Sequence, residues 1–342
     1  MGRTTMKRHV TSANDVAKKA GVSQATVSRV FSSSSYVSKE TRKKVLNVAK
    51  QLNYQPNALA RGLITQKTNI IGIAMKDIKN PFYQEILEIT TKKLRDIGYT
   101  VMFIYTNNDT IQEEELRFFL EFNVAGLIVT DALLSSDIVD KLTNYQIPVV
   151  LINRYDKSLT CHTVQCDNVN AAKSIATYIY NTGAKDIVYI SGKQNTSTNQ
   201  DREKGFINTL KNKDIKLTIL NGDYTYEKAF SKTSHLIKKG HLPDAIFGAN
   251  DITSLGALNA LKMHNLSIPK DVIIVGFDNI AMASWPDNLL STWAQPKEKM
   301  VDAAINILLS KEKQKKRQNI TIPGHFIHRS TTIKSSRTIQ NR

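Results

Sequence analysis

The 342-residue sequence lacks the features of membrane, secreted and disulfide-rich proteins. It has no run of eighteen or more apolar residues, and the start MGRTTMKRHV is polar and basic, without the apolar stretch of a secretory signal. Only two cysteines occur, Cys161 and Cys166, which are too few for a disulfide framework. We therefore predict a cytoplasmic protein that has no membrane segment and no disulfides.

The signatures of the common catalytic sites are also missing. There is no glycine-rich phosphate loop, no Gly-x-Ser-x-Gly motif and no His or Cys spacing typical of a metal site. His162, between the two cysteines, is expected to lie in an ordinary strand and loop. We predict a protein that is not an enzyme, with no catalytic residue, no metal and no cofactor. Its 41% hydrophobic residues are sufficient for a sizeable core and for two or three domains.

Positive charge is concentrated at the N-terminus. The formal net charge is +17, and the first 67 residues carry +11 of it, since they hold 13 Lys and Arg but only Asp15 and Glu40 as acids. A protein that is basic only for solubility would spread this charge along the chain. The concentration favours a polyanionic partner such as nucleic acid.

The basic segment has the pattern of three short helices. TSANDVAKKAGVSQATVSRVF divides into a helix capped by Thr11 or Ser12, a tight turn at Gly21, and a second helix capped by Ser23. A third helix is predicted from Ser38. Apolar residues at helical spacing would form one small core: Val16, Ala17, Ala20, Val27, Val30, Val45, Val48, Ala49 and Leu52.

The face of the second helix opposite its valines groups side chains that can bind DNA bases. In a major groove, glutamine can pair with adenine, arginine with guanine, and a methyl group can contact thymine. We predict that this face reads sequence through Gln24, Ala25, Ser28 and Arg29. Neighbouring hydroxyl-bearing residues would hold phosphates, which fixes the register on DNA: Ser23, Thr26, Tyr36, Ser38 and Thr41.

The strings DVAKKAGVSQATVSRVF and YVSKETRKKVLNVAKQLNYQPNALARGL resemble the DNA-binding headpiece and hinge of the LacI family of regulators over their full length. SANDVA departs from the Thr-Ile-x-DVA start that is frequent in the family. The resemblance implies a helix-turn-helix domain at 1–56 and a hinge helix with its linker at 57–67. It also implies that this hinge contacts DNA through Asn57, Ala60 and Leu63, with the leucine wedged into the minor groove. A helix of two turns is marginal alone, so it should form only when two copies pack on DNA.

Beyond the hinge, short apolar runs alternate with segments of helical period, which is typical of parallel strands joined by helices. We predict an α/β core at 68–342 with two doubly wound parallel sheets. The resemblance implies a periplasmic-binding-protein-like core of two lobes, at about 68–166 with 296–325 and at about 167–291 with 326–342. An effector would bind in the cleft between the lobes, at the carboxyl ends of the strands.

Several polar and aromatic residues follow the predicted strands, and some match positions that contact ligand in the family. The predicted effector-binding residues are Phe82, Tyr83, Asn153, Arg154, Thr198, Arg202, Tyr224, Asn250, Asp251, Asp278 and Gln295. Asn250 and Asp278 have a second interpretation, as capping residues at strand-to-helix turns. Lys193 could favour a phosphate-bearing ligand, but we interpret it as a surface lysine. Thr196, where a purine-sensing relative has arginine, argues against a purine.

Together these features predict a repressor of carbohydrate-utilisation genes that binds double-stranded operator DNA and a small-molecule effector, a sugar. The C-terminus has no leucine heptad, so we expect a homodimer rather than a tetramer. Two alternatives remain open. One is a solute-binding protein without a DNA function, and the other is a regulator that responds to a nucleobase or a sugar phosphate.

Overall fold

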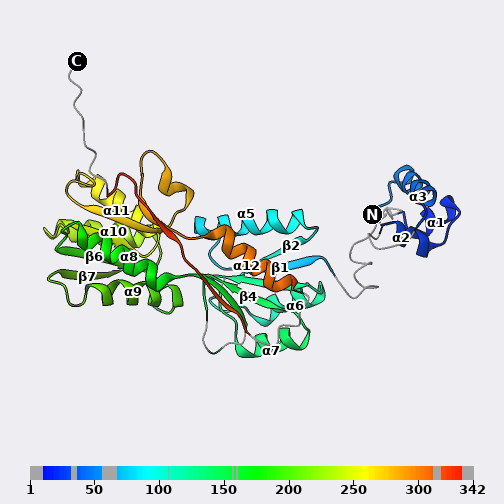
Figure 1. The fold of residues 1–342 in the computed structure, drawn as a ribbon, viewed down its shortest axis with the longest axis horizontal. Helices are drawn as coiled ribbons and strands as arrows, with labels where there is room; N and C mark the ends of the chain where they lie inside the picture. The colour runs from blue at the N-terminus through cyan, green and yellow to red at the C-terminus, as the bar shows by residue number, and fades with distance from the viewer. Residues whose placement is uncertain are drawn as a thin grey trace, which may run out of the picture. The chain divides into compact units, whose positions relative to one another are not determined.

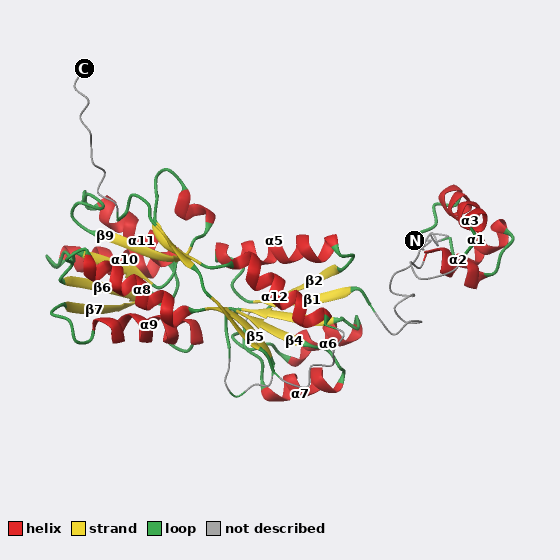
Figure 2. Ribbon diagram, viewed as in Figure 1, coloured by secondary structure: helices red, strands yellow, loops and turns green. Residues whose placement is uncertain are grey.

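The computed structural model describes residues 11–31, 37–55, 68–106, 108–155, 158, 161–310 and 317–332. The chain divides into two compact units, residues 1–68 and 69–342, which we call the headpiece and the core (Figures 1 and 2). Four residues predicted to bind DNA lie outside the described residues: Tyr36, Asn57, Ala60 and Leu63.

The headpiece consists of α1 (Ala13–Ala20), α2 (Gln24–Phe31) and α3 (Lys39–Gln51). Ser12 caps α1 in a capping box with Asp15. The start of this helix, where SANDVA departs from the family pattern, is therefore capped by its own side chains. The turn to α2 passes through Gly21 at φ +64°, a conformation that glycine adopts without strain. Ser23 and Ser38 accept hydrogen bonds from backbone N–H groups at the starts of α2 and α3, as the sequence predicts.

The three helices enclose one small apolar core. Seven of the nine predicted core residues are buried, and Val48 and Leu52 are half-buried at its edge. Phe31 and Tyr54 close the open end with their rings in an edge-to-face arrangement, 5.7 Å between centroids. Arg42 of α3 donates a hydrogen bond of 2.8 Å to the carbonyl of Val30, which fixes α2 against α3.

The first sheet of the core has the strand order β11-β5-β4-β3-β1-β2, and all its strands are parallel. The strands are β1 (Ile70–Met75), β2 (Thr100–Tyr105), β3 (Gly126–Thr130), β4 (Val149–Ile152), β5 (His162–Cys166) and β11 (Asn319–Ile322). Its helices are α5 (Pro81–Asp96), α6 (Glu113–Glu121), α7 (Ser136–Asn144) and α12 (Lys297–Leu309). Side chains alternate along β3: Ile128 packs in the cluster that includes residues of α5 and α12, and Leu127 and Val129 in the cluster with α6 and α7.

The second sheet has the order β12-β10-β9-β8-β6-β7. Its strands are β6 (Asp186–Ser191), β7 (Lys216–Asn221), β8 (Ala245–Gly248), β9 (Ile273–Asp278), β10 (Ser291–Ala294) and β12 (His325–Ile327). The helices around it are α8 (Asn168–Asn181), α9 (Ser197–Leu210), α10 (Tyr226–Lys238), α11 (Asp251–Met263) and the short 3₁₀ helix η1 (Ala281–Ser284). The strands are parallel, as predicted, except for the short edge strand β12, which pairs antiparallel with β10.

The chain passes between the two sheets three times, so each lobe is discontinuous (Figure 1). The first two passages follow Cys166 and Ala294, and the third lies between Ile322 and His325. The lobe bounds that the family resemblance implies place the third passage slightly later, at about 325–326. His325 already pairs with Ala294 of β10, because Gly324 allows the chain to approach that strand so closely that a Cβ there would lie 2.3 Å from the Ala294 carbonyl oxygen.

Within the described residues, no helix is long and apolar enough to span a bilayer. Cys161 and Cys166 are both buried, and neither forms a disulfide within the described residues. In the same part of the chain, no group of three or more His, Cys, Asp or Glu is placed to bind a metal ion.

Replacement of Gly205 by alanine should destabilise the core. Gly205 lies where α9 meets α8, and a Cβ there would be 2.3 Å from the carbonyl oxygen of Val169. Overpacking of this kind costs about 1–3 kcal/mol, so we expect a clear drop in the urea midpoint of Gly205→Ala. Asn208→Ala, at an exposed position of the same helix, is the control. Equal midpoints for the two variants would contradict this account of the helix contact.

Candidate functional site

The proposed DNA-reading face of α2 is open to solvent. Gln24, Ala25, Ser28 and Arg29 are all exposed, whereas Val27 and Val30 on the opposite face are buried against α1 and α3. Because the helix is only 8 residues long and anchored by these valines, its outer side chains have a fixed direction relative to the headpiece.

The helix starts of the headpiece offer a suitable environment for phosphate groups. Thr26 and Thr41 are half-buried, and their hydroxyls lie 2.9 and 2.8 Å from those of Ser23 and Ser38. Helix N-termini carry partial positive charge and favour anions. The exposed lysines of α1 and α3 add full positive charge: Lys18, Lys19, Lys39, Lys43, Lys44 and Lys50.

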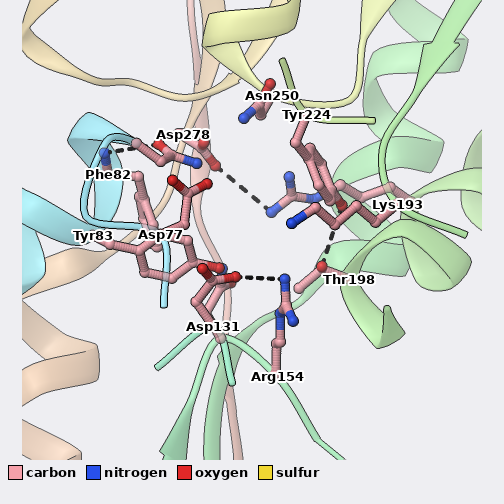
Figure 3. A pocket seen from close by; sticks show the side chains of 13 residues that line it. Asp77, Phe82, Tyr83, Asp131, Arg154, Lys193, Thr198, Tyr224, Asn250 and Asp278 are labelled. Carbon is pink, nitrogen blue, oxygen red and sulfur yellow. Dashed lines mark hydrogen bonds and ion pairs between the residues drawn. The ribbon is translucent and has the colours of Figure 1, made fainter. Parts of the chain in front are cut away.

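The core contains a pocket between its two lobes, and Figure 3 shows the side chains around it. Nine of the eleven predicted effector-binding residues line it: Phe82, Tyr83, Asn153, Arg154, Thr198, Arg202, Tyr224, Asn250 and Asp278. Each follows a strand, or is the last residue of one, at the carboxyl edge of its sheet, which brings residues far apart in sequence together. The pocket comprises about 340 Å³ of space, part of it open to solvent, and most of that space is too narrow for a water molecule.

The first lobe supplies the aromatic side chains of this pocket. Asn80 caps α5 by accepting a hydrogen bond of 3.1 Å from the N–H of Phe82, which places Phe82 and Tyr83 in the first turn. Their rings meet edge to face with 5.2 Å between centroids. Asn153 donates a 3.3 Å hydrogen bond to the Tyr83 hydroxyl, and burial raises the pKa of Tyr83 well above its usual range. The tyrosine therefore remains a neutral hydroxyl.

Two buried ion pairs lie on opposite sides of the pocket. In the first lobe, Arg154 Nη2 is 2.5 Å from Asp131 Oδ1. In the second lobe, Arg202 Nη2 is 3.6 Å from Asp278 Oδ1, and the guanidinium stacks 3.6 Å from the ring centroid of Phe277. Burial raises the pKa of Asp278 to about 6 although Arg202 opposes this change.

The formal charges around the pocket balance. Its lining includes three acids, Asp77, Asp131 and Asp278, and three bases, Arg154, Lys193 and Arg202. A ligand with a net charge would therefore disturb a balanced set of buried or half-buried charges, which is costly where solvation is poor.

The pocket also presents buried polar atoms that make no hydrogen bond to another described residue. Two are acceptors, Asp131 Oδ2 and Asn153 Oδ1, and two are donors, Arg154 Nε and Asn250 Nδ2. Asn250 lines the pocket and is also a capping residue, because its Oδ1 caps α11 by accepting from the N–H of Thr253 at 2.9 Å. Buried polar groups ordinarily have partners, and hydroxyl groups, which donate and accept, would satisfy both kinds.

Two predicted effector-binding residues lie outside the pocket. Asp251 is fully buried and points away, accepting hydrogen bonds from the Ile280 N–H at 2.9 Å and the Thr292 hydroxyl at 2.6 Å. Gln295 donates a 2.7 Å hydrogen bond to Asp278, so its contact with the pocket is indirect. Both side chains instead link segments at or next to neighbouring strands.

Four lining residues were absent from the predicted set. Asp77, Asn80 and Asp131 follow β1 and β3, and the rule that placed the other residues at strand ends would have found them. Lys193 follows β6, is half-buried and lines the pocket. Thr196 caps α9 by accepting from the N–H of Asn199.

The buried Asp251 should make stability depend on pH. Burial and the neighbouring Asp278 raise the pKa of Asp251 to about 8, so the folded chain holds this proton more tightly than the unfolded chain. The resulting stabilisation is complete below the unfolded pKa near 4 and is lost as the pH rises towards 8. We expect the wild type to lose more unfolding free energy between pH 5 and pH 8 than Asp251→Asn, as measured by urea unfolding. Parallel losses would show that this carboxyl does not titrate in that range.

Comparison with known proteins agrees with this organisation. Residues 12–57 match the family described as bacterial regulatory proteins, lacI family, and residues 68–330 match the periplasmic binding proteins and sugar binding domain of the LacI family. The HTH-type transcriptional regulator RegA of Clostridium saccharobutylicum is 31% identical over 330 residues, 94% of this chain and 99% of that protein. Catabolite control protein A of Priestia megaterium is 32% identical over 303 residues, 86% of this chain and 90% of that protein. A crystal structure of the lac repressor dimer, bound to operator and the anti-inducer ONPF, shares the fold with a TM-score of 0.82 and 23% identity, over 95% of this chain and 99% of that one. The chain belongs to the LacI family of bacterial regulatory proteins.

Proposed function

We propose that the protein is a transcription repressor of carbohydrate-utilisation genes whose affinity for a specific operator is controlled by a sugar bound between the two lobes. The observation that carries this proposal is the exposed face of α2, with Gln24 and Arg29, in a basic headpiece joined to a core with a polar pocket. RegA, a regulator by name, and the lac repressor, whose structure holds operator DNA, support the same assignment.

In the proposed complex, α2 of each headpiece enters a major groove. Gln24 and Arg29 contact base edges, whereas Ser23, Thr26, Ser38 and Thr41 contact phosphates. Two headpieces of a homodimer bind the two halves of a near-palindromic site. The hinge residues Asn57, Ala60 and Leu63 keep the role that the family resemblance implies, contact with the minor groove at the centre of the site.

The pocket favours a neutral, hydroxyl-rich effector over its alternatives. Three acids balance three bases, which disfavours a sugar phosphate, because a phosphate would add uncompensated negative charge. The unpartnered donors and acceptors on both lobes match hydroxyl groups, and the rings of Phe82 and Tyr83 can pack against the apolar face of a sugar. A solute-binding protein without DNA function would leave the exposed face and the charge of the headpiece unexplained.

Occupation of the pocket requires movement of the lobes. The pocket is narrow in this arrangement, so we expect the lobes to separate to admit a sugar and then to close around it in a different arrangement. If that arrangement changes the positions of the two headpieces, DNA and sugar affinities are coupled reciprocally, typically by about 1–3 kcal/mol. Release of the operator by the sugar is the behaviour we propose.

Replacement of Arg29 by alanine should relax sequence preference rather than weaken all binding equally. An operator is first selected from random duplexes with the wild-type protein, and affinities for all single-base variants of it are then measured. Loss of a bidentate arginine contact removes about 1–3 kcal/mol of discrimination at one base pair. Lys44→Ala, at an exposed position of α3 outside that face, should weaken binding to all duplexes alike. A uniform loss in Arg29→Ala would show that Arg29 contacts phosphate only.

A thermal-shift screen of the full chain should separate the effector classes. Neutral monosaccharides and disaccharides, their phosphates, and free nucleobases are compared at equal concentrations. A ligand that binds only the folded state raises its stability, and we expect such a rise with a neutral sugar, abolished in Arg202→Ala. A rise with phosphates or nucleobases alone would contradict the charge argument.

A further inference from the structure

Within the part of the chain that the structure describes, polar contacts between the lobes occur at two places next to the pocket. At the first, Tyr155 follows β4 in the first lobe, and its hydroxyl lies 3.0 and 3.2 Å from the two carboxylate oxygens of Asp201 on α9 of the second lobe. The backbone N–H of Tyr155 also donates a 3.1 Å hydrogen bond to the hydroxyl of Ser197 on the same helix. We call this group the tyrosine clasp.

At the second place, two residues of the first lobe hold the segment of the second lobe that follows β9. Glu85 of α5 accepts a 2.9 Å hydrogen bond from the N–H of Ala281. Lys297 of α12 donates a 2.8 Å hydrogen bond to the carbonyl of Asn279 and also pairs with Glu85. We call this group the glutamate clasp.

None of these residues lines the pocket, but each clasp is adjacent in sequence to residues that do. Tyr155 follows Arg154, and Asn279 follows Asp278. The clasps therefore join the two lobes beside two different lining residues, Arg154 and Asp278. They do not fill the space that a ligand would take. Because each lobe has its own sheet and its own packed helices, separating the lobes would break both clasps in one motion.

We propose that Tyr155 is a positioning residue of the effector site, because its clasp holds the two lobes together. The tyrosine clasp and the glutamate clasp open together when the lobes separate. This inference rests on the proposed function in one respect, that lobe closure governs access to the effector pocket. Hydrogen bonds to a carboxylate are stronger than those between neutral groups. Burial and the nearby Asp201 raise the pKa of Tyr155 to about 12, which keeps its hydroxyl protonated as a donor.

Hydrogen exchange in the full chain tests this proposal without a ligand or DNA. The probe is the amide of Ala281 in the glutamate clasp, which Tyr155 does not touch. In Tyr155→Phe we expect this amide to exchange about tenfold faster, since loss of one hydrogen bond to a charged group favours the open arrangement by roughly that factor. Ser197→Ala should also make the Ala281 amide exchange faster. Amides in the centre of β3 should keep their rates, which separates lobe opening from general destabilisation.

The matched control is Tyr226→Phe. The Tyr226 hydroxyl accepts a 3.0 Å hydrogen bond from Asn259, and both residues belong to the second lobe, so exchange at Ala281 should stay unchanged. The proposal would be overturned if exchange in Tyr155→Phe became faster only in the residues around position 155. It would also be overturned if Tyr226→Phe made the Ala281 amide exchange equally fast. Since the measurement uses neither effector nor operator, its failure is distinct from failure of the proposed function, which the sugar screen and operator selection test.

Discussion

A single buried guanidinium organises the second lobe at its end nearest the pocket. Arg202 donates hydrogen bonds to the Asn168 side chain at 2.9 Å and to the Ala249 carbonyl at 2.6 Å. It also pairs with Asp278 and stacks on the ring of Phe277. A buried cation is tolerated only when its donors and its charge are compensated. Here that compensation comes from α8, the end of β8 and the end of β9, so satisfying one side chain fixes the relative positions of three segments.

The polar atoms around the pocket fall into two groups, those with partners in their own lobe and those without. The side chains around Arg202 have fixed partners in their own lobe, and so does the Arg154–Asp131 pair across the pocket. The polar atoms without partners are distributed over both lobes, as Asn153 and Asn250 show. A molecule that satisfies them must contact both lobes, which gives it different affinities for the open and closed arrangements. Such a difference is the requirement for a ligand to shift a conformational equilibrium.

The sequence predicts those elements whose signal is local. The short apolar runs that form β1, β3 and β9 and the serine caps of the headpiece are properties of neighbouring residues, and the structure confirms them. The strands β10, β11 and β12 have only 4, 4 and 3 residues, and their pairing is fixed by distant partners. For this reason the sequence pattern could not predict the antiparallel direction of β12. Tertiary pairing decides such short segments, because propensity over three or four residues is weak.

The same distinction applies within the pocket. Adjacent Asn250 and Asp251 both follow β8, and nothing local says that one faces the pocket while the other faces the strands. The rotation of α11 decides this, and it depends on packing against β8 and β9. Topology predicts that residues directly after a strand lie near the pocket. Asp77 and Asp131 also follow strands and line the pocket, so this rule finds more lining residues than the predicted set contained. The roles of the individual side chains in binding stay predictions.

The interleaved path of the chain has a consequence for its synthesis. Residues 319–322 form the outermost strand of one sheet, and residues 325–327 form the outermost strand of the other. The ribosome makes the headpiece first, since domains emerge from the N-terminus onward. Neither lobe can be completed until these last strands emerge, so a nascent or prematurely terminated chain would carry a finished headpiece on two sheets with unprotected edges. Exposed edges of that kind promote aggregation, which would remove a truncated, unregulated DNA binder from solution.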